Sequence, residues 1–106
     1  MQNQILQHIA QVIKLDPSEE TEFLSVLSER KLLKKEFLLE PGQEVLSEFY
    51  VVSGCLEAYY QDESGNRHII QFAVEDWWIS DFEAFFSGRK AELFVVAIEN
   101  SLLLEI

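Results

Sequence analysis

Histidine is the side chain most suited to metal binding and proton transfer near neutral pH, and this chain has two, His8 and His68. They lie on different predicted elements, and neither has a second histidine, cysteine or carboxylate at metal-ligand spacing beside it. A zinc or iron site needs several such ligands at one point. The sequence therefore disfavours a metal site, and we expect a solvated or half-buried His68 and an exposed His8.

Cys55 and the acidic pairs are the remaining candidates for catalysis. Cys55 has no His or Lys nearby in sequence, so nothing predicts a lowered thiol pKa. We expect an unreactive thiol, and redox sensing is the alternative. Glu75 with Asp76 and Asp81 with Glu83 are close pairs, but such pairs arise by chance among 19 Asp and Glu residues. We expect neither an enzyme nor a bound cofactor.

Half of the eight basic residues fall in one short segment, at Arg30, Lys31, Lys34 and Lys35. Such a cluster is typical of a solvated strand edge, and a phosphate-binding patch is the sharper alternative. The formal net charge of −11 opposes any partner that carries phosphates. We therefore expect no direct DNA binding by this chain.

The densest aromatic cluster lies between Trp77 and Phe86, with five aromatic residues in ten positions. Such rings fill a core or line a pocket for a flat ligand. Successive side chains of a strand face opposite sides, so Trp77 and Trp78 cannot both point inward. One of them is predicted to be available to a ligand, a partner or a neighbouring element.

The elements that position these residues must share one core, because 106 residues leave room for a single domain. Eight Phe, three Tyr and two Trp provide the apolar area that an acidic chain needs to fold. The single cysteine and the absence of a secretory signal pattern predict a cytoplasmic chain. No apolar run approaches the roughly 20 residues of a membrane span, so no membrane partner is expected.

Helices are predicted at the start of the chain, where apolar residues recur at helical spacing over about residues 1–14. Asp16-Pro17 is a helix-start signal, with an acceptor at the cap and a proline just inside. A second helix is predicted from there to about Glu29, with a buried face formed by Phe23, Leu24 and Leu27. Residues 1–29 are thus a helical lead.

Residues 30–106 have the shorter apolar period of strands. Strands are predicted at Glu36–Leu39, Phe49–Val52, Leu56–Tyr60, His68–Val74, Leu93–Ile98 and Leu102–Ile106. Turn signals separate them at Pro41-Gly42, Ser53-Gly54 and Glu63-Ser64-Gly65-Asn66. The predicted fold is mainly β, an antiparallel roll or sandwich behind the helices.

An irregular stretch from Glu75 to Lys90 interrupts the strands. Within it, Asp81 is predicted to cap a short helix that ends at Ser87-Gly88. The chain then ends on an apolar strand-like run up to Ile106, which predicts a piece of a longer protein rather than a natural end. A genuine end that completes a sheet is the alternative.

A family resemblance is carried by three segments in order, residues 37–42 (FLLEPG), 49–59 (FYVVSGCLEAY) and 65–72 (GNRHIIQF). They resemble the cyclic-nucleotide-binding sensor domain of the Crp/Fnr transcription regulators, over about Thr21 to Ile106. Trp78-Ile79-Ser80-Asp81 and the short aromatic helix are similar to the divergent branch common in Bacteroidetes-type bacteria. The resemblance implies an antiparallel β-roll of the double-stranded β-helix, or jelly-roll, type with N-terminal helices.

In that family the irregular stretch is a phosphate-binding cassette, in which a Gly-Glu pair opens the short helix and an Arg precedes the next strand. Ser80-Asp81 stands at the Gly-Glu position, which keeps a carboxylate for a ribose hydroxyl on a shorter arm. Ala91 stands where the phosphate-gripping Arg would be, and Arg89 or Lys90 could replace it only through a shift of register. The resemblance therefore implies weak or no binding of cyclic AMP.

The ligand site implied by the resemblance lies beside the short helix. Its candidate residues are Trp78, Ser80, Asp81, Phe82, Arg89 and Lys90, with Phe72 and Tyr60 as walls. No catalytic or metal-binding residue is predicted.

The function implied by the resemblance is effector sensing in a transcription regulator. A small molecule, with a nucleotide as one candidate, would bias a DNA-binding domain between two orientations. Full-length members continue into a dimerisation helix and a helix-turn-helix domain, neither of which is in this chain, so a homodimer is expected only of the longer protein. Two alternatives stay open: a ligandless interaction module in which Trp77 and Trp78 pack on a partner helix, and a metal-dependent cupin enzyme, which the histidine count disfavours.

Overall fold

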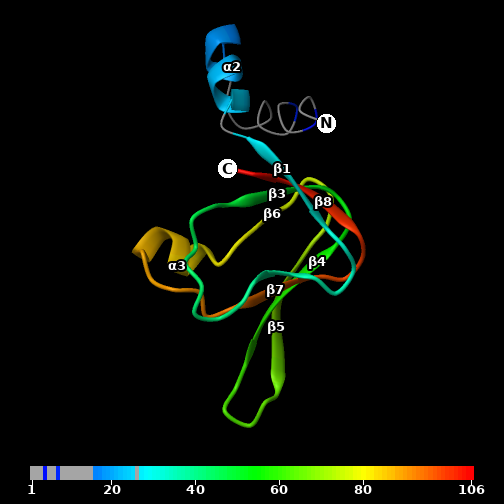
Figure 1. Cartoon of the computed structure of the whole chain (residues 1–106), viewed down its shortest axis with the longest axis vertical. Coiled ribbons are helices and arrows are strands. Elements are labelled where there is room, and N and C mark those ends of the chain that lie inside the picture. Colours follow the sequence, from blue (N-terminus) through cyan, green and yellow to red (C-terminus); the bar gives the residue numbers. More distant parts are fainter. Residues whose placement is uncertain (1–3, 5–6, 8–15, 26) are drawn as a thin grey trace.

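The computed structural model describes residues 4, 7, 16–25 and 27–106 (Figure 1). The predicted first helix and His8 lie outside the described residues, apart from Gln4 and Gln7. The elements in chain order are α2 (Pro17–Ser25), β1 (Ser28–Leu32), β2 (Phe37–Leu39), β3 (Phe49–Ser53), β4 (Leu56–Gln61), β5 (Arg67–Ala73), β6 (Trp78–Ile79), α3 (Phe82–Ser87), β7 (Phe94–Ala97) and β8 (Ser101–Glu105).

The strands form two four-stranded sheets in which all pairs are antiparallel. One sheet has the order β1-β8-β3-β6 and is called sheet A here, and sheet B has the order β2-β7-β4-β5. The core lies between them, where Val51 and Leu103 of sheet A and Leu56 and Val95 of sheet B are fully buried. The mainly β jelly-roll fold predicted from the sequence is therefore confirmed.

Helix α2 begins where the sequence predicts and ends earlier. The Asp16 carboxylate accepts a hydrogen bond from the Glu19 N–H at 2.8 Å, and the Glu19 carboxylate accepts one from the Asp16 N–H, which forms a capping box. The predicted end near Glu29 is wrong, because Ser28–Leu32 pairs with β8 as a strand. No residue of α2 is buried, and Phe23 is half-buried against the outer face of sheet A.

Helix α3 is confirmed at both ends. The Asp81 side chain accepts a hydrogen bond from the Ala84 N–H at 3.1 Å, and Gly88 ends the helix in the left-handed region, with φ of 73°. Figure 1 shows α3 at one side of the roll, between β6 and β7 in the chain.

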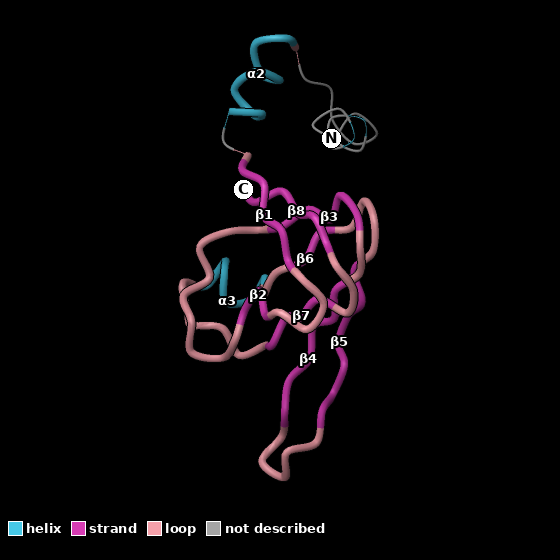
Figure 2. The backbone as a smooth tube through the Cα atoms, turned by 45° about the vertical axis from the view of Figure 1, so that its right-hand side comes forward, coloured by secondary structure: helices cyan, strands magenta, loops and turns pink. Residues whose placement is uncertain are grey.

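The hairpin of β4 and β5 extends beyond the rest of the roll, as Figure 2 shows. At its turn the Asp62 carboxylate accepts hydrogen bonds from the N–H groups of Ser64 and Asn66, both at 2.9 Å. Asp62 also lies 2.9 Å from the His68 ring, and these hydrogen bonds, that to His68 first, lower the pKa of the Asp62 carboxyl. One side chain thus fixes the turn that the sequence predicts at this position.

No helix in the described part of the chain is long and apolar enough to cross a membrane.

Candidate ligand-binding site

A cavity of about 570 Å³ lies between the β4–β5 hairpin and the start of α3. Its volume falls within the range of small-molecule sites in proteins. We call it the hairpin cavity, and it is lined by Ala58, Tyr60, Gln61, Ile70, Gln71, Ser80, Asp81, Phe82, Glu83, Glu92 and Leu93. Four of the residues predicted for the ligand site are therefore brought together here: Tyr60, Ser80, Asp81 and Phe82.

Asp81 is the central polar residue of this cavity. Its side chain is buried, with 4% exposed. One carboxylate oxygen, Oδ1, caps α3 at Ala84, and the other, Oδ2, accepts hydrogen bonds from the N–H groups of Glu92 at 2.9 Å and Leu93 at 3.2 Å. Asp81 was predicted to face a ribose hydroxyl, but both of its oxygens already accept backbone hydrogen bonds.

Ser80 and Gln71 contribute polar atoms that are anchored to the roll. The Ser80 hydroxyl donates to the Ser47 carbonyl at 3.0 Å, and the Gln71 amide donates to the Trp78 carbonyl at 3.1 Å. Because its amide nitrogen is held in this way, Gln71 presents its amide oxygen as an acceptor in a fixed direction, which favours directional recognition of a ligand.

The aromatic side of the cavity is formed by Tyr60 and Phe82. The Tyr60 ring stacks on the His68 ring, with centroids 4.7 Å apart and planes 10° apart. Since His68 is cross-strand from Tyr60, this stack belongs to the hairpin itself. It supports a flat aromatic surface at the cavity, which suits a planar heterocycle.

The charges at the cavity are negative. Asp81, Glu83 and Glu92 line it, and none of its lining residues is a Lys or Arg. The two predicted cations do not line the cavity but lie next to it. Arg89 is 3.9 Å from Glu83 in an exposed ion pair, and Arg89 and Lys90 line a small adjoining hollow together with Asp81, Glu83 and Glu92. A phosphate in the cavity would therefore meet carboxylates and no cation among the lining residues.

Phe72 and Trp78 also lie outside the cavity. Phe72 is cross-strand from Glu57 while Gln71 is cross-strand from Ala58, so strand alternation turns Phe72 to the opposite face of sheet B. Trp78 is cross-strand from Tyr50 and packs edge-on against its ring, with centroids 5.5 Å apart, on the outer face of sheet A. Trp77 precedes β6 and is 51% exposed, so neither tryptophan points into the core and strand alternation does not decide their difference.

Ala91 is buried, with 4% exposed, and belongs to the hydrophobic core cluster. Its backbone bonds to the turn before β3, because its N–H donates to the Gln43 carbonyl at 2.8 Å and its carbonyl accepts from the Gly42 N–H at 2.9 Å. The chain is thus fixed in register just before Glu92. Since Ala91 is fixed there, a shift that would bring Arg89 to its place would break both bonds.

Several lining residues were not predicted from the sequence: Ala58, Gln61, Ile70, Gln71, Glu83, Glu92 and Leu93. The bulge in β5 explains part of this difference. Ala58 pairs with Gln71 and Tyr59 pairs with Ile69, so Ile70 is the extra residue. A bulge lets Ile70 and Gln71 both reach one cavity, and strict alternation in the sequence gives no sign of it.

Cys55 and the candidate metal ligands lie in environments that the described part of the chain defines. Burial and then the negative charges of Glu99 and Glu57 raise the pKa of the Cys55 thiol. No three His, Cys, Asp or Glu side chains are grouped there as metal ligands would be.

Solved structures show the same fold. The sensor domain of the transcriptional regulator DNR from Pseudomonas aeruginosa aligns at a TM-score of 0.78 with 19% identity, covering 99% of this chain and 73% of that one. The regulatory subunit of a cAMP-independent protein kinase A from Trypanosoma cruzi, bound to guanosine, aligns at 0.80 with 18% identity, covering 99% of this chain and 38% of that one. The catabolite activator protein of Thermus thermophilus aligns at 0.75 with 17% identity, covering 87% of this chain and 43% of that one. The chain thus spans less than half of the length of the latter two.

Comparison with curated protein sequences found no match. A family model described as the cyclic nucleotide-binding domain matches residues 29–106, from β1 to the end of β8. This match includes both sheets, α3 and every residue that lines the hairpin cavity. The chain therefore belongs to the cyclic nucleotide-binding domain family.

Proposed function

We propose that this chain is the effector-sensing domain of a Crp/Fnr-like transcription regulator, and that its effector is an uncharged, planar small molecule of the nucleoside type. The observation that carries the proposal is the hairpin cavity, which has an aromatic wall and no cation among its lining residues. A cyclic nucleotide carries a phosphate that this lining would repel, whereas an uncharged heterocycle would stack on Tyr60 without that cost.

Asp81 supports this choice of ligand. Its carboxylate already accepts hydrogen bonds from the N–H groups of Glu92 and Leu93. These N–H groups would otherwise be donors for an anion in the cavity. The fold relative from Trypanosoma cruzi, a protein described as cAMP-independent, is bound to guanosine, which supports a nucleoside as the ligand class. The proposed class is therefore consistent with both the charge of the cavity and the ligand of that relative.

The regulatory step that we propose couples the cavity to the chain after it. A ligand in contact with Phe82 and Leu93 would press on α3 and on the segment entering β7 together, because Asp81 bonds the two. In the longer regulator this would bias a DNA-binding domain, and a dimer, between two arrangements. The chain itself would work in the cytoplasm without touching DNA.

The test is binding by calorimetry and thermal shift, with guanosine, adenosine and inosine against cyclic AMP and cyclic GMP. We expect a nucleoside to bind and both cyclic nucleotides to give no heat at tens of micromolar. Tyr60→Ala should weaken the nucleoside at least about tenfold, the loss of one stacking contact of the strength seen for bases on aromatic side chains. Phe72→Ala is the matched control, since Phe72 is an exposed aromatic residue on the other face of the same hairpin.

Two results would contradict the proposal. The first is a cyclic nucleotide that binds more tightly than the nucleosides, which would mean that the carboxylates do not select against phosphate. The second is a nucleoside whose affinity falls equally in Tyr60→Ala and Phe72→Ala, which would place the ligand outside the hairpin cavity.

A ligandless interaction module is the second candidate, and the exposed Trp77 favours it. Its neighbour Val74 is 45% exposed, so a small apolar surface lies at the turn between β5 and β6. If this candidate is right, no small molecule will stabilise the chain, and Trp77→Ser will abolish binding of the remainder of the regulator without changing the melting temperature.

A further inference from the structure

Two charged side chains face inward from sheet A, where the strand pattern calls for apolar residues. Arg30 is cross-strand from Leu103, and Glu105 is cross-strand from Phe49. Directly paired residues of an antiparallel sheet face the same side, and Leu103 and Phe49 are buried in the core. Arg30 and Glu105 therefore project toward the gap between the sheets, and such breaks of the pattern concentrate at functional sites.

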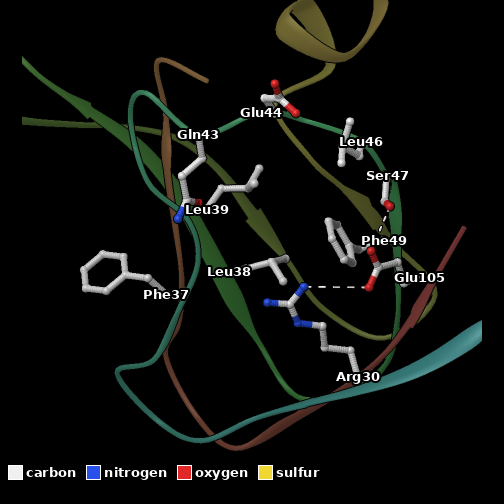
Figure 3. A pocket seen from close by; sticks show the side chains of 10 residues that line it. All are labelled: Arg30, Phe37, Leu38, Leu39, Gln43, Glu44, Leu46, Ser47, Phe49 and Glu105. Atoms are coloured by element: carbon white, nitrogen blue, oxygen red, sulfur yellow. Dashed lines mark hydrogen bonds and ion pairs between the residues drawn. The ribbon is translucent and has the colours of Figure 1, made fainter. Parts of the chain in front are cut away.

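A second cavity, of about 500 Å³, surrounds this pair, and we call it the Arg30 cavity (Figure 3). None of its lining residues lines the hairpin cavity. Figure 3 shows Leu38, Leu39 and Phe49 projecting into it beside the pair. These three apolar side chains are 3% to 6% exposed, whereas Leu46 at its rim is 78% exposed. The cavity therefore has an apolar floor, an open mouth and three charged side chains, Arg30, Glu44 and Glu105.

The two charges are held differently. Glu105 is anchored, because its Oε2 accepts a hydrogen bond from the Ser47 hydroxyl at 2.8 Å. Arg30 lies with Nη1 3.7 Å from Oε1 of Glu105, which is beyond hydrogen-bond distance, and its side chain is 42% exposed. Its guanidinium carbon lies 5.8 Å from the centre of the Phe49 ring. The structure records no hydrogen bond from this guanidinium to a described residue, so its donors are available to a ligand in the cavity that Arg30 lines.

We propose that the Arg30 cavity binds a small zwitterion with an apolar side chain, of the free α-amino acid type. The ligand carboxylate would take the donors of Arg30 in a two-point contact, and its ammonium would lie against Glu105 and Glu44. The apolar side chain would lie on Leu38 and Phe49. A ligand of this class separates the loose ion pair and gives each charge a new partner, so neither charge is left unpaired.

Other ligand classes fit less well. A plain carboxylate would pair with Arg30 but leave Glu105 and Glu44 facing its negative charge. A plain amine would pair with Glu44 or Glu105 but would leave the donors of Arg30 unused. An uncharged apolar molecule would cover both charges without pairing them, which costs more than it gains. The charge pattern therefore selects a molecule that carries one charge of each sign.

The experiment uses L-leucine and L-phenylalanine as probes, measured by calorimetry and by two-dimensional NMR of the full 106-residue chain. Isocaproate and isoamylamine are the matched analogues of leucine that lack the ammonium and the carboxylate. We expect an amino acid to bind, with shifts at Arg30, Ser47 and Leu38 and none at Tyr60 or Gln71. Each analogue should bind at least about tenfold more weakly, as the loss of a charge-assisted contact predicts.

Arg30→Gln should weaken the amino acid at least about tenfold for the same reason. Arg89→Gln is its control, since Arg89 is also an exposed arginine in a long ion pair but lies outside the Arg30 cavity. Both variants should keep the melting temperature of the parent within a few degrees, because each pair is exposed.

Three results would overturn the proposal: no binding of either amino acid at millimolar concentration, binding of isocaproate as tight as that of leucine, or an equal effect of Arg30→Gln and Arg89→Gln. Nucleoside binding at the hairpin cavity is read from Tyr60 and Gln71 in the same spectra, so the two sites succeed or fail separately.

Discussion

The carboxylate of Asp81, the residue just before α3, accepts a hydrogen bond from the backbone N–H of Glu92 at 2.9 Å. This bond joins the start of α3 to the segment that enters β7. The same carboxylate caps the helix. One side chain therefore closes the loop around α3 at both ends, and α3 and β7 are positioned together.

The first prediction concerns the stability that this residue provides. Asp81→Ala removes the helix cap and leaves the partly buried N–H groups of Glu92 and Leu93 without their acceptor. We expect a loss of about 2 to 4 kcal/mol in the free energy of unfolding, from the cost of a lost cap and of unsatisfied, partly buried donors. Urea unfolding measures it. Glu83→Ala, on the exposed face of α3, is the control, and an equal effect of both changes would show that the long-range bonds contribute nothing.

The second prediction concerns cyclic AMP. The family's phosphate-binding arginine is replaced here by Ala91, and the lost contact costs about 1.5 to 3 kcal/mol of binding free energy, or about one to two decades of affinity. Ala91→Arg should not restore this affinity, because Ala91 is 4% exposed in the hydrophobic core cluster and does not line the hairpin cavity. We expect Ala91→Arg to bind cyclic AMP no more tightly than the unmodified chain and to lower the melting temperature, since the change places a charge in the core. Calorimetry decides, and micromolar binding by the unmodified chain would show that the cavity tolerates phosphate.

The third prediction concerns Gly54, at the turn between β3 and β4. The φ of Gly54 is 109°, and a Cβ added there would clash with the hydroxyl of Ser101 and would lie 2.7 Å from the Cα of Ser101. Gly54→Ala should therefore unfold the chain or lower its melting temperature by more than 10 °C, on the order of 2 kcal/mol or more. Gly65→Ala, also at positive φ but with no atom within 4 Å of the added Cβ, should cost only about 1 kcal/mol. Equal melting temperatures for the two variants would contradict the close approach to Ser101.

The fourth prediction concerns β8. A variant that ends at Asn100 lacks a strand that lies between β1 and β3, and it loses Leu103 and Leu104, which are 0% and 1% exposed. Removing two buried leucines alone costs about 4 to 10 kcal/mol, which is comparable with the whole stability of a domain. We expect this variant to be unfolded or aggregated by circular dichroism and light scattering. A cooperative melt at the parent temperature would overturn the strand assignment.

The fifth prediction concerns the pH dependence of Cys55 alkylation. Its thiol pKa is raised from 9.0 by burial and by the charges of Glu99 and Glu57, so the reactive thiolate is scarcer at neutral pH than in an unperturbed thiol. Alkylation by iodoacetamide should be slower than that of glutathione at pH 8 and should rise about tenfold per pH unit to beyond pH 9. A plateau below pH 8 would indicate a reactive cysteine and revive the redox-sensing alternative.

Local signals made much of the fold predictable. The cap at Asp81, the stop at Gly88 and the hairpin turn near Gly65 are set by residues within a few positions of each other. Strand β1 was not predictable, because four of its five residues are exposed and only its pairing with β8 makes it a strand. Strand β6 has two residues and depends on β3 in the same way.

The site was predictable only where it follows local sequence. Residues 80–82 were predicted for the site, and they line the hairpin cavity. Gln71 and Leu93 were missed, because the bulge in β5 and the long-range bond from Asp81 bring them there. The charge of the cavity was likewise hidden, since the sequence does not show that Arg89 and Lys90 line the adjoining hollow and not the cavity itself.

The antiparallel pairing of β1 with β8 has a consequence for how the chain folds. Ser28 pairs with Glu105, so sheet A cannot assemble until residues from nearly opposite ends of the chain meet. The β4–β5 hairpin closes across a few residues and can form early, whereas β1 and β3 must wait with open edges for β8. During synthesis on a ribosome, the apolar face of β3 would be exposed until β8 leaves the exit tunnel, and that interval is when the chain is most dependent on chaperones.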